Sequence, residues 1–196
     1  MKKIFTILLL SNLFYLAFAQ QTCSTFTEVP LRTFTTIPQN ECYYLKDTQN
    51  ELNDYVGTWK ASWNDRTIYI YITKRVKFYE WVGKYYSDNL VIRFKTIANN
   101  GTVLFDNTSL PDSQVKIEGL KFRKADDRYG FVYIDFDLCD TSGEVRINFN
   151  NPTKTQLQWN YFQNKYEWLD SDCFFYNYPP DQLPNPLPKA AIFVKQ

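Results

Sequence analysis

The sequence predicts an all-β protein, specifically an antiparallel up-and-down β-barrel of about eight strands, with a β-sandwich as the alternative. Three observations predict this class. Apolar and polar residues alternate with a period of two through most of the chain, as they do in half-buried strands. Short clusters rich in Asn, Asp, Gly and Ser separate these runs. The composition also favours strands, because 15 tyrosines and 16 phenylalanines accompany a single methionine.

The clearest expected strand covers residues 67–73, where isoleucine alternates with tyrosine or threonine. Other runs follow the same pattern; the regular ones are 90–95, 132–137, 145–150 and 157–161, and the less regular ones are 56–63, 103–106 and 115–123. In the last of these, Gly119 interrupts the alternation between Ile117 and Leu120. A glycine in that position predicts a β-bulge.

Carboxylates are the catalytic option that this composition leaves open. A glycosidase needs two carboxyl groups about 5–9 Å apart, one of them in an apolar cleft. In the run 132–137, Val132, Ile134 and Phe136 predict the inward face, so Asp135 and Asp137 are expected to point outward into solvent. A solvated pair does not meet the requirement. We therefore expect the protein not to be an enzyme, and assign no catalytic residue.

The absence of histidine excludes the largest set of functions. With no histidine in the chain, Ser-His-Asp and Cys-His catalysis and imidazole metal ligands are ruled out. The cysteines lack the close spacing of zinc sites, and the aspartates around Asp135, Asp137 and Asp140 lack the spacing of a calcium loop. A formal net charge of +1 gives no general attraction to phosphate backbones. We expect no metal, no cofactor and no nucleic-acid partner.

The first nineteen residues have the pattern of a signal peptide. Lys2 and Lys3 precede an apolar stretch, and the small-x-small sequence ending at Ala19 predicts cleavage between Ala19 and Gln20. The alternative is a membrane anchor, but a span needs about 20 apolar residues, and this stretch is shorter and interrupted by Ser11 and Asn12. We expect an exported protein, periplasmic or extracellular, without a transmembrane span in the mature chain.

The cysteines agree with export. An even number of cysteines outside the cytosol indicates disulfides, and the chain has four, Cys23, Cys42, Cys139 and Cys173. Four cysteines allow three pairings. The pairing Cys23–Cys42 with Cys139–Cys173 is favoured, because each bond would then tie a local excursion to its neighbour.

The expected organisation has four parts. Residues 1–19 are the signal peptide, 20–54 an N-terminal lead that wraps the body, 55–178 the barrel and 179–196 a proline-rich tail. The tail is expected to be extended and polyproline-like. We expect it to be packed on aromatic residues or exposed, rather than to serve as a recognition ligand. The apolar residues 190–194 at its end are expected to dock as a short edge strand.

Gly57-Thr58-Trp59 opens the first expected barrel strand, and here the chain resembles the calycins, that is, lipocalins, fatty-acid-binding proteins and avidins. These families begin their first strand with Gly-x-Trp, and the resemblance implies that Gly57 and Trp59 close one end of the barrel. Two lipocalin features are absent, namely a later Thr-Asp-Tyr and an arginine that covers the tryptophan. The wider chain also resembles small exported bacterial proteins of unknown function.

A calycin barrel is either filled by side chains or holds one small ligand. The resemblance therefore implies an exported, lipocalin-like protein that binds a small apolar or aromatic ligand, although no ligand-binding residue is assigned. The alternative is a non-enzymatic structural or interaction protein of the envelope, with a solid barrel core and an envelope protein as its partner. The sequence fixes neither the oligomeric state nor whether the barrel is hollow.

Overall fold

The computed structural model describes residues 23–164, 172–179 and 182–196, so the predicted signal peptide and its cleavage site at Ala19 and Gln20 lie outside the described residues. Eight antiparallel strands close into a ring. Its strands are β3 (Gly57–Trp63), β4 (Arg66–Glu80), β5 (Tyr85–Ala98), β7 (Ile117–Phe122), β8 (Tyr129–Asp135), β9 (Thr141–Phe149), β10 (Gln156–Gln163) and β11 (Ala190–Lys195). The predicted barrel is confirmed in preference to the β-sandwich.

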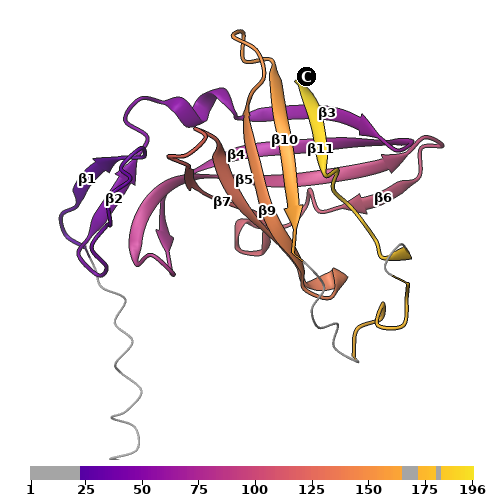
Figure 1. The fold of residues 1–196 in the computed structure, drawn as a ribbon. Coiled ribbons are helices and arrows are strands. Elements are labelled where there is room, and N and C mark those ends of the chain that lie inside the picture. The colour runs from indigo at the N-terminus through magenta and orange to yellow at the C-terminus, as the bar shows by residue number, and fades with distance from the viewer. Residues whose placement is uncertain (1–22, 165–171, 180–181) are drawn as a thin grey trace, which may run out of the picture.

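The ring closes in a way that the sequence did not indicate. Its order is β5-β4-β3-β11-β10-β9-β8-β7, and β7 pairs back onto β5. The C-terminal strand β11 lies between β10 and β3, where Val194 pairs with both Gln156 and Lys60. The expectation of an edge strand at 190–194 is therefore wrong, because β11 has a partner on each side. Figure 1 shows β9, β10 and β11 side by side.

Three strands lie outside the ring. β1 (Thr27–Pro30) pairs in parallel with β2 (Tyr43–Lys46), β2 pairs with the start of β5, and β6 (Val103–Asp106) pairs with the end of β5. The residues of β6, expected to be an ordinary member of the strand series, therefore stand beside the ring. Figure 1 shows β1 and β2 apart from it. Three short 3₁₀ helices complete the fold, η2 (Glu51–Asp54), η3 (Asp112–Gln114) and η4 (Phe136–Leu138).

The barrel interior is filled with side chains. Trp59, Trp159, Tyr129 and Tyr133 have no exposed surface, and inward isoleucines such as Ile70 surround them. The rings contact one another: the Trp159 and Phe193 centroids are 5.3 Å apart, and those of Phe122 and Tyr129 are 5.0 Å apart. Because burying each large apolar side chain stabilises the fold by roughly 1.5–3 kcal/mol, this centre is a packed core.

In strand β8 the buried face is the one that was predicted to be exposed. Tyr133 is buried and Asp135 is 2% exposed, whereas Ile134 and Phe136 are 39% and 78% exposed. The expectation that Asp135 points outward is therefore wrong. The buried carboxylate is satisfied, because it accepts hydrogen bonds from the Tyr133 hydroxyl at 3.0 Å and from Lys116 Nζ at 2.5 Å. The larger aromatic residues of β8 take the interior and leave the aliphatic ones outside.

The bulge predicted at Gly119 is present. The pairing of β7 with β8 shifts between Gly119 and Phe122. A Cβ atom on Gly119 would lie 2.3 Å from the carbonyl oxygen of Leu90, so only glycine fits this close approach. A second shift, between Arg75 and Phe78, explains why β4 and β5 are longer than the alternation indicated. This second irregularity interrupts the alternation of apolar and polar residues in the middle of the β4–β5 hairpin.

Both favoured disulfides form. Cys23–Cys42 links the two ends of the segment that carries β1, and Cys139–Cys173 links η4 to the segment before the tail. The Cα–Cα distance is 5.6 Å in each, inside the usual range for a disulfide. The two bonds lie in different parts of the molecule, one in the N-terminal lead and one after β8.

Candidate functional site

Trp59 lies near one end of the barrel, where the lead joins β3. Its indole Nε1 donates to the carbonyl oxygen of Tyr55 at 2.8 Å. On the other side, Lys195 Nζ lies 5.1 Å from the indole centroid and donates to the carbonyl oxygen of Asp54 at 3.0 Å. Gly57 has a φ of 133° and approaches the Lys195 side chain. The cation over Trp59 is thus a lysine from the closing strand.

Three aromatic rings cover the core at this end. Tyr55 and Phe149 are stacked, with centroids 4.3 Å apart and planes at 26°, and Phe122 lies 6.4 Å from Tyr55. Tyr55 is 5% exposed and Phe122 is 1% exposed. These rings separate the packed core from the solvent outside. We call Tyr55, Phe122 and Phe149 the aromatic floor.

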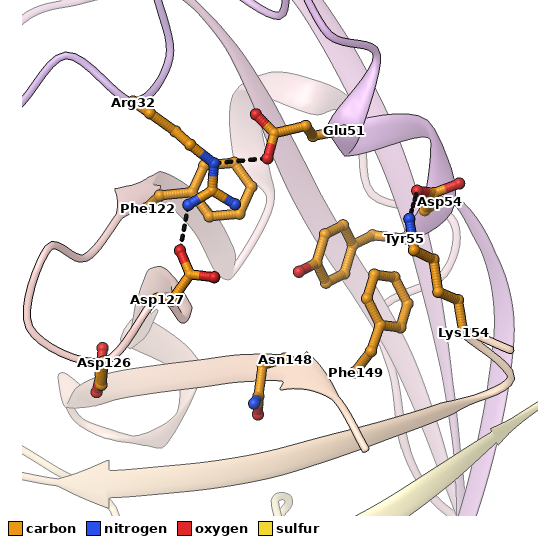
Figure 2. A pocket seen from close by; sticks show the side chains of 10 residues that line it. All are labelled: Arg32, Glu51, Asp54, Tyr55, Phe122, Asp126, Asp127, Asn148, Phe149 and Lys154. Carbon is orange, nitrogen blue, oxygen red and sulfur yellow. Dashed lines mark hydrogen bonds and ion pairs between the residues drawn. The ribbon is translucent and has the colours of Figure 1, made fainter. Parts of the chain in front are cut away.

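Charged side chains surround the aromatic floor, as Figure 2 shows. Arg32 lies 3.9 Å from the Phe122 centroid and binds Glu51 at 2.6 Å as well as Asp127. Asp54 and Lys154 form a further ion pair on the opposite side of the floor. We call these five residues the ionic rim. Its members come from the lead, from the β7–β8 turn and from the β9–β10 hairpin.

The position of the rim depends on Asp47. This side chain is 6% exposed and accepts hydrogen bonds from the backbone N–H groups of Glu51 and Leu52, at 2.8 and 3.1 Å. Lys74 Nζ lies 2.7 Å from the same carboxylate. Because the first N–H groups of a helix have no partner within the helix, Asp47 fixes η2 and thereby places Glu51 and Asp54 over the barrel end.

Floor and rim enclose an open pocket of about 290 Å³. In Figure 2 the Tyr55 hydroxyl points into it. The Asn148 side chain also lines the pocket, and its buried Oδ1 has no partner among the described residues. The lining contains four carboxylates against two cations, as Asp126 joins the rim residues. The pocket is therefore rich in hydrogen-bond acceptors.

The protonation states of three lining residues contribute to the polarity of the pocket. Burial raises the pKa of the Tyr55 hydroxyl, so the phenol stays neutral and able to donate. Although burial opposes it, the hydrogen bonds that Arg32 donates to Glu51 and Asp127 raise the pKa of Arg32, which keeps its charge. Burial also opposes ionisation of Asp126, but hydrogen bonds from the Arg128 backbone and the Arg123 side chain lower its pKa. Arg32 and Asp126 therefore both carry their charges at neutral pH.

The opposite end of the barrel is closed by the proline-rich tail. Leu187 has no exposed surface and belongs to the core. The carbonyl of Pro186 accepts from Thr96 Oγ1 at 3.1 Å, and that of Pro188 accepts from the Trp159 indole at 2.9 Å. The tail is therefore packed on an aromatic residue, one of the two arrangements expected for it. The tail therefore covers this end of the barrel.

The pair Asp135 and Asp137, considered above for catalysis, does not form a free carboxylate dyad. Lys116 Nζ lies 2.5 Å from Asp135 and 2.6 Å from Asp137, so one ammonium bridges both carboxylates. Asp137 is largely exposed. Among the described residues, no group of three or more Cys, Asp or Glu side chains is placed to hold a metal ion. The described part of the chain also contains no helix with the length and apolarity of a membrane span.

One family model covers this sequence. The family is described as a family of unknown function, DUF6705, and its model matches residues 1–196. The chain belongs to DUF6705. Neither a curated protein nor a solved structure shows significant similarity to it.

The sequence of this DUF6705 protein did not predict the ionic rim, although it predicted that Gly57 and Trp59 lie at one end of the barrel. Arg32, Glu51, Asp127 and Lys154 are ordinary charged residues in loops, and nothing in their local sequence sets them apart. Only the fold brings them together. Asp47, which positions Glu51 and Asp54, lies in the short polar stretch before the first ring strand and carries no pattern that marks this role.

Proposed function

We propose that this DUF6705 protein is an exported, non-catalytic binding protein with a lipocalin-like barrel, and that it binds a small aromatic amine in the pocket between the aromatic floor and the ionic rim. One observation carries the proposal: an acceptor-rich pocket opens over aromatic rings at the barrel end marked by Trp59. The ligand is the small aromatic one that the calycin resemblance implies, with a positive charge added by the chemistry of the rim.

The surroundings of Trp59 support the relationship to calycins. An arginine over this tryptophan is absent, but Lys195 occupies an equivalent place, 5.1 Å from the indole centroid. Its ammonium also bonds to the carbonyl of Asp54 and so joins the closing strand to η2. A cation over an indole face is a stabilising contact. The departure from the lipocalin pattern is thus a change of residue and not a loss of the contact.

The filled interior supports binding at the barrel end. A ligand inside the ring would displace side chains such as Trp159 and Phe193, which have no exposed surface. The end pocket requires no such change, because its volume of about 290 Å³ is already close to the lower limit for small-molecule sites, about 300 Å³. This size suits a ligand with a single ring.

The distribution of charge supports an amine. Asp126, Asp127 and Asp54 each present a carboxylate to the pocket, and the unpaired Oδ1 of Asn148 adds a neutral acceptor. A protonated amine supplies several N–H donors and the opposite charge, while its ring meets the edges of Tyr55 and Phe149. An anionic ligand of the same shape would meet like charge and be rejected.

The absence of a catalytic role is part of the proposal. The chain has no histidine, and the carboxylates of the rim are held in ion pairs with Arg32 and Lys154. A carboxyl group that acts as a general acid needs a raised pKa, whereas that of Asp126 is lowered. The pocket is therefore equipped to hold a ligand and not to transfer a proton to it.

The test is calorimetric titration with three ligands of similar shape. We expect 2-phenylethylamine to bind at least about tenfold more tightly than neutral 2-phenylethanol, a difference of about 1.4 kcal/mol, and 3-phenylpropanoate not to bind. The double variant Asp126→Asn with Asp127→Asn is expected to lose the preference for the amine. Glu41→Gln, an exposed charge outside the pocket, is the matched control. Equal affinity for all three ligands would refute the charge argument.

Export is tested separately. Two disulfides suit an oxidising compartment. Expression of the full chain with its natural leader, followed by N-terminal sequencing of the released protein, is expected to give a chain that begins at Gln20. A protein retained in the cytosol with Met1 intact would contradict the proposal.

A second candidate function is interaction with an envelope protein. The observation in its favour is a pair of exposed phenylalanines, Phe136 at 78% and Phe174 at 77%, on either side of the Cys139–Cys173 disulfide. Large exposed apolar side chains that lie together mark interaction surfaces. A pull-down from envelope extract with Phe136→Ser and Phe174→Ser tests it. Recovery of the same proteins by wild type and variant would remove its support.

A further inference from the structure

The β4–β5 hairpin extends well beyond the ring. The pairing of β3 with β4 ends at Gly57 and Ile72, yet β4 continues to Glu80. On the return, β5 begins at Tyr85 but reaches its ring partner β7 at Val91 and Ile92. Figure 1 shows this part of the hairpin beside β1 and β2, outside the ring. The hairpin thus projects beyond its ring partners and ends in the turn between Glu80 and Tyr85.

The turn carries apolar side chains in solvent. Val82 is 93% exposed, Trp81 is 70% exposed, and Val76, on the same projection, is 68% exposed. An exposed tryptophan next to an exposed valine is unusual on the surface of a soluble domain, where large apolar side chains lie together mainly at interaction sites. The barrel itself does not need these residues, because its core is complete without them.

The projection is rigid. The Lys84 N–H donates to the Glu80 carbonyl at 2.6 Å and closes the turn. Under it, Tyr79 makes edge contacts with Trp81 and a tilted contact with Tyr86, with centroids 5.0 and 5.1 Å apart. Asp88, which is 3% exposed, accepts from the Tyr44 hydroxyl at 2.6 Å and so ties the hairpin to the lead. The apolar tip is therefore presented in a fixed position.

The charges around the tip are predominantly positive. Lys77 and Lys84 are exposed, and Lys77 Nζ lies 3.6 Å from the Phe26 centroid. Glu80, the acid of the turn, is part-buried and receives a hydrogen bond from Asn89 at 3.1 Å. Glu41 is the exposed acid of the adjacent lead, next to Asn40, which binds the Lys84 carbonyl. Two exposed lysines therefore stand beside the apolar turn against one exposed carboxylate.

We propose that this hairpin tip inserts into the interface of an anionic phospholipid membrane, with Trp81 and Val82 entering the headgroup region and Lys77 and Lys84 binding lipid phosphates. Tryptophan prefers the membrane interface, and lysines beside an apolar anchor are attracted by anionic lipid. The projection of the tip beyond the ring favours a lipid surface over a protein partner with a flat face. The inference does not depend on the amine pocket.

The test uses purified full-length mature protein and sedimentation of lipid vesicles. Wild type is expected to bind vesicles of phosphatidylcholine with phosphatidylglycerol and to bind much less to phosphatidylcholine alone. The double variant Trp81→Ser with Val82→Ser is expected to lose at least about tenfold in vesicle affinity. Leu120→Ser, which removes an exposed apolar side chain elsewhere on the barrel, is the control and keeps the affinity. Lys77→Gln with Lys84→Gln is expected to lose the dependence on salt.

A second readout follows Trp81 itself. Its fluorescence is expected to shift to the blue on addition of anionic vesicles, and the shift is expected to be absent in Trp81→Ser. Failure of wild type to bind, or equal binding by the tip variant, would overturn the proposal. So would a concentration-dependent dimer that Trp81→Ser abolishes, because a second copy of the chain would then be the partner of the tip. Amine titration is unaffected by any of these outcomes.

Discussion

The two ends of the barrel are closed by different means. At one end the chain plugs itself, because Leu187 enters the core and the carbonyls of Pro186 and Pro188 accept hydrogen bonds from the wall. At the other end three rings form a floor, and charged side chains from distant segments stand around it and leave a pocket. At the first end the tail itself occupies the space, and its backbone carbonyls bond to side chains of the barrel strands. At the second end the ion pairs around the aromatic rings leave polar groups facing solvent. The second arrangement is the one to which we assign ligand binding.

The comparison predicts that stability depends most on the plugged end. Leu187→Ala is expected to lower the free energy of unfolding by about 2–5 kcal/mol, because it removes buried methyl groups and leaves a cavity. Urea denaturation measures the loss. Leu120→Ala is the control, since Leu120 is 46% exposed, and it is expected to cost less than about 1 kcal/mol. Equal costs would mean that the tail does not contribute to the core.

The disulfides provide the second prediction. Cys139→Ser with Cys173→Ser opens a link that spans 34 residues, and the chain-entropy relation gives a loss of about 4 kcal/mol. Cys23→Ser with Cys42→Ser opens a link of 19 residues, and the same relation gives about 3 kcal/mol. Chemical denaturation of each double variant measures these losses. We expect amine binding to be lost only with the Cys23–Cys42 bond, because that bond holds the lead that carries Arg32.

The third prediction concerns pH and the β4–β5 hairpin, which lies outside both barrel ends. Burial and the neighbouring Glu118 raise the pKa of Glu80 from 4.5 to about 7. The folded protein therefore keeps a proton that the unfolded chain releases, so stability is expected to fall as pH rises from about 4.5 to about 7. The loss is expected to be about 3 kcal/mol. Glu80→Gln should flatten this part of the pH profile, while Glu41→Gln should leave it unchanged.

The smallest effects are expected at the ionic rim. Lys154→Gln breaks a half-exposed pair with Asp54 and is expected to change the free energy of unfolding by less than about 1 kcal/mol. Because the lining then loses one of its two cations, affinity for 2-phenylethylamine is expected to rise about twofold to fivefold. Calorimetry measures the affinity and thermal denaturation the stability. A large loss of stability would show that the rim supports the fold.

Much of the fold could be predicted from the sequence. A period of two identified most ring strands, cysteine spacing favoured the disulfides that form, and Gly119 marked its bulge. The position of β11 could not be predicted, because the sequence of an apolar strand after a proline-rich segment does not indicate which strands it pairs with. In β8 both faces are apolar, with Phe131 and Tyr133 against Val132 and Ile134, so periodicity alone does not decide which face is buried.

No residue of the pocket was predicted from the sequence. The local pattern Gly57-Thr58-Trp59 predicted only that these residues lie at one end of the barrel, which is where Trp59 lies. Arg32, Asp127 and Lys154 lie far apart in the chain and have no such pattern. Binding sites assembled from loop charges depend on tertiary structure, and a short sequence window contains no information about it.

The most direct test of the central claim is NMR titration of the ¹⁵N-labelled protein with 2-phenylethylamine. The account predicts that chemical-shift changes are confined to the pocket end, at Tyr55, Asn148 and Phe149, while the indole signal of Trp159 at the plugged end stays fixed. Changes centred on Trp159 and Phe193 would place the ligand inside the barrel, and the contrast between an open and a plugged end would then be wrong.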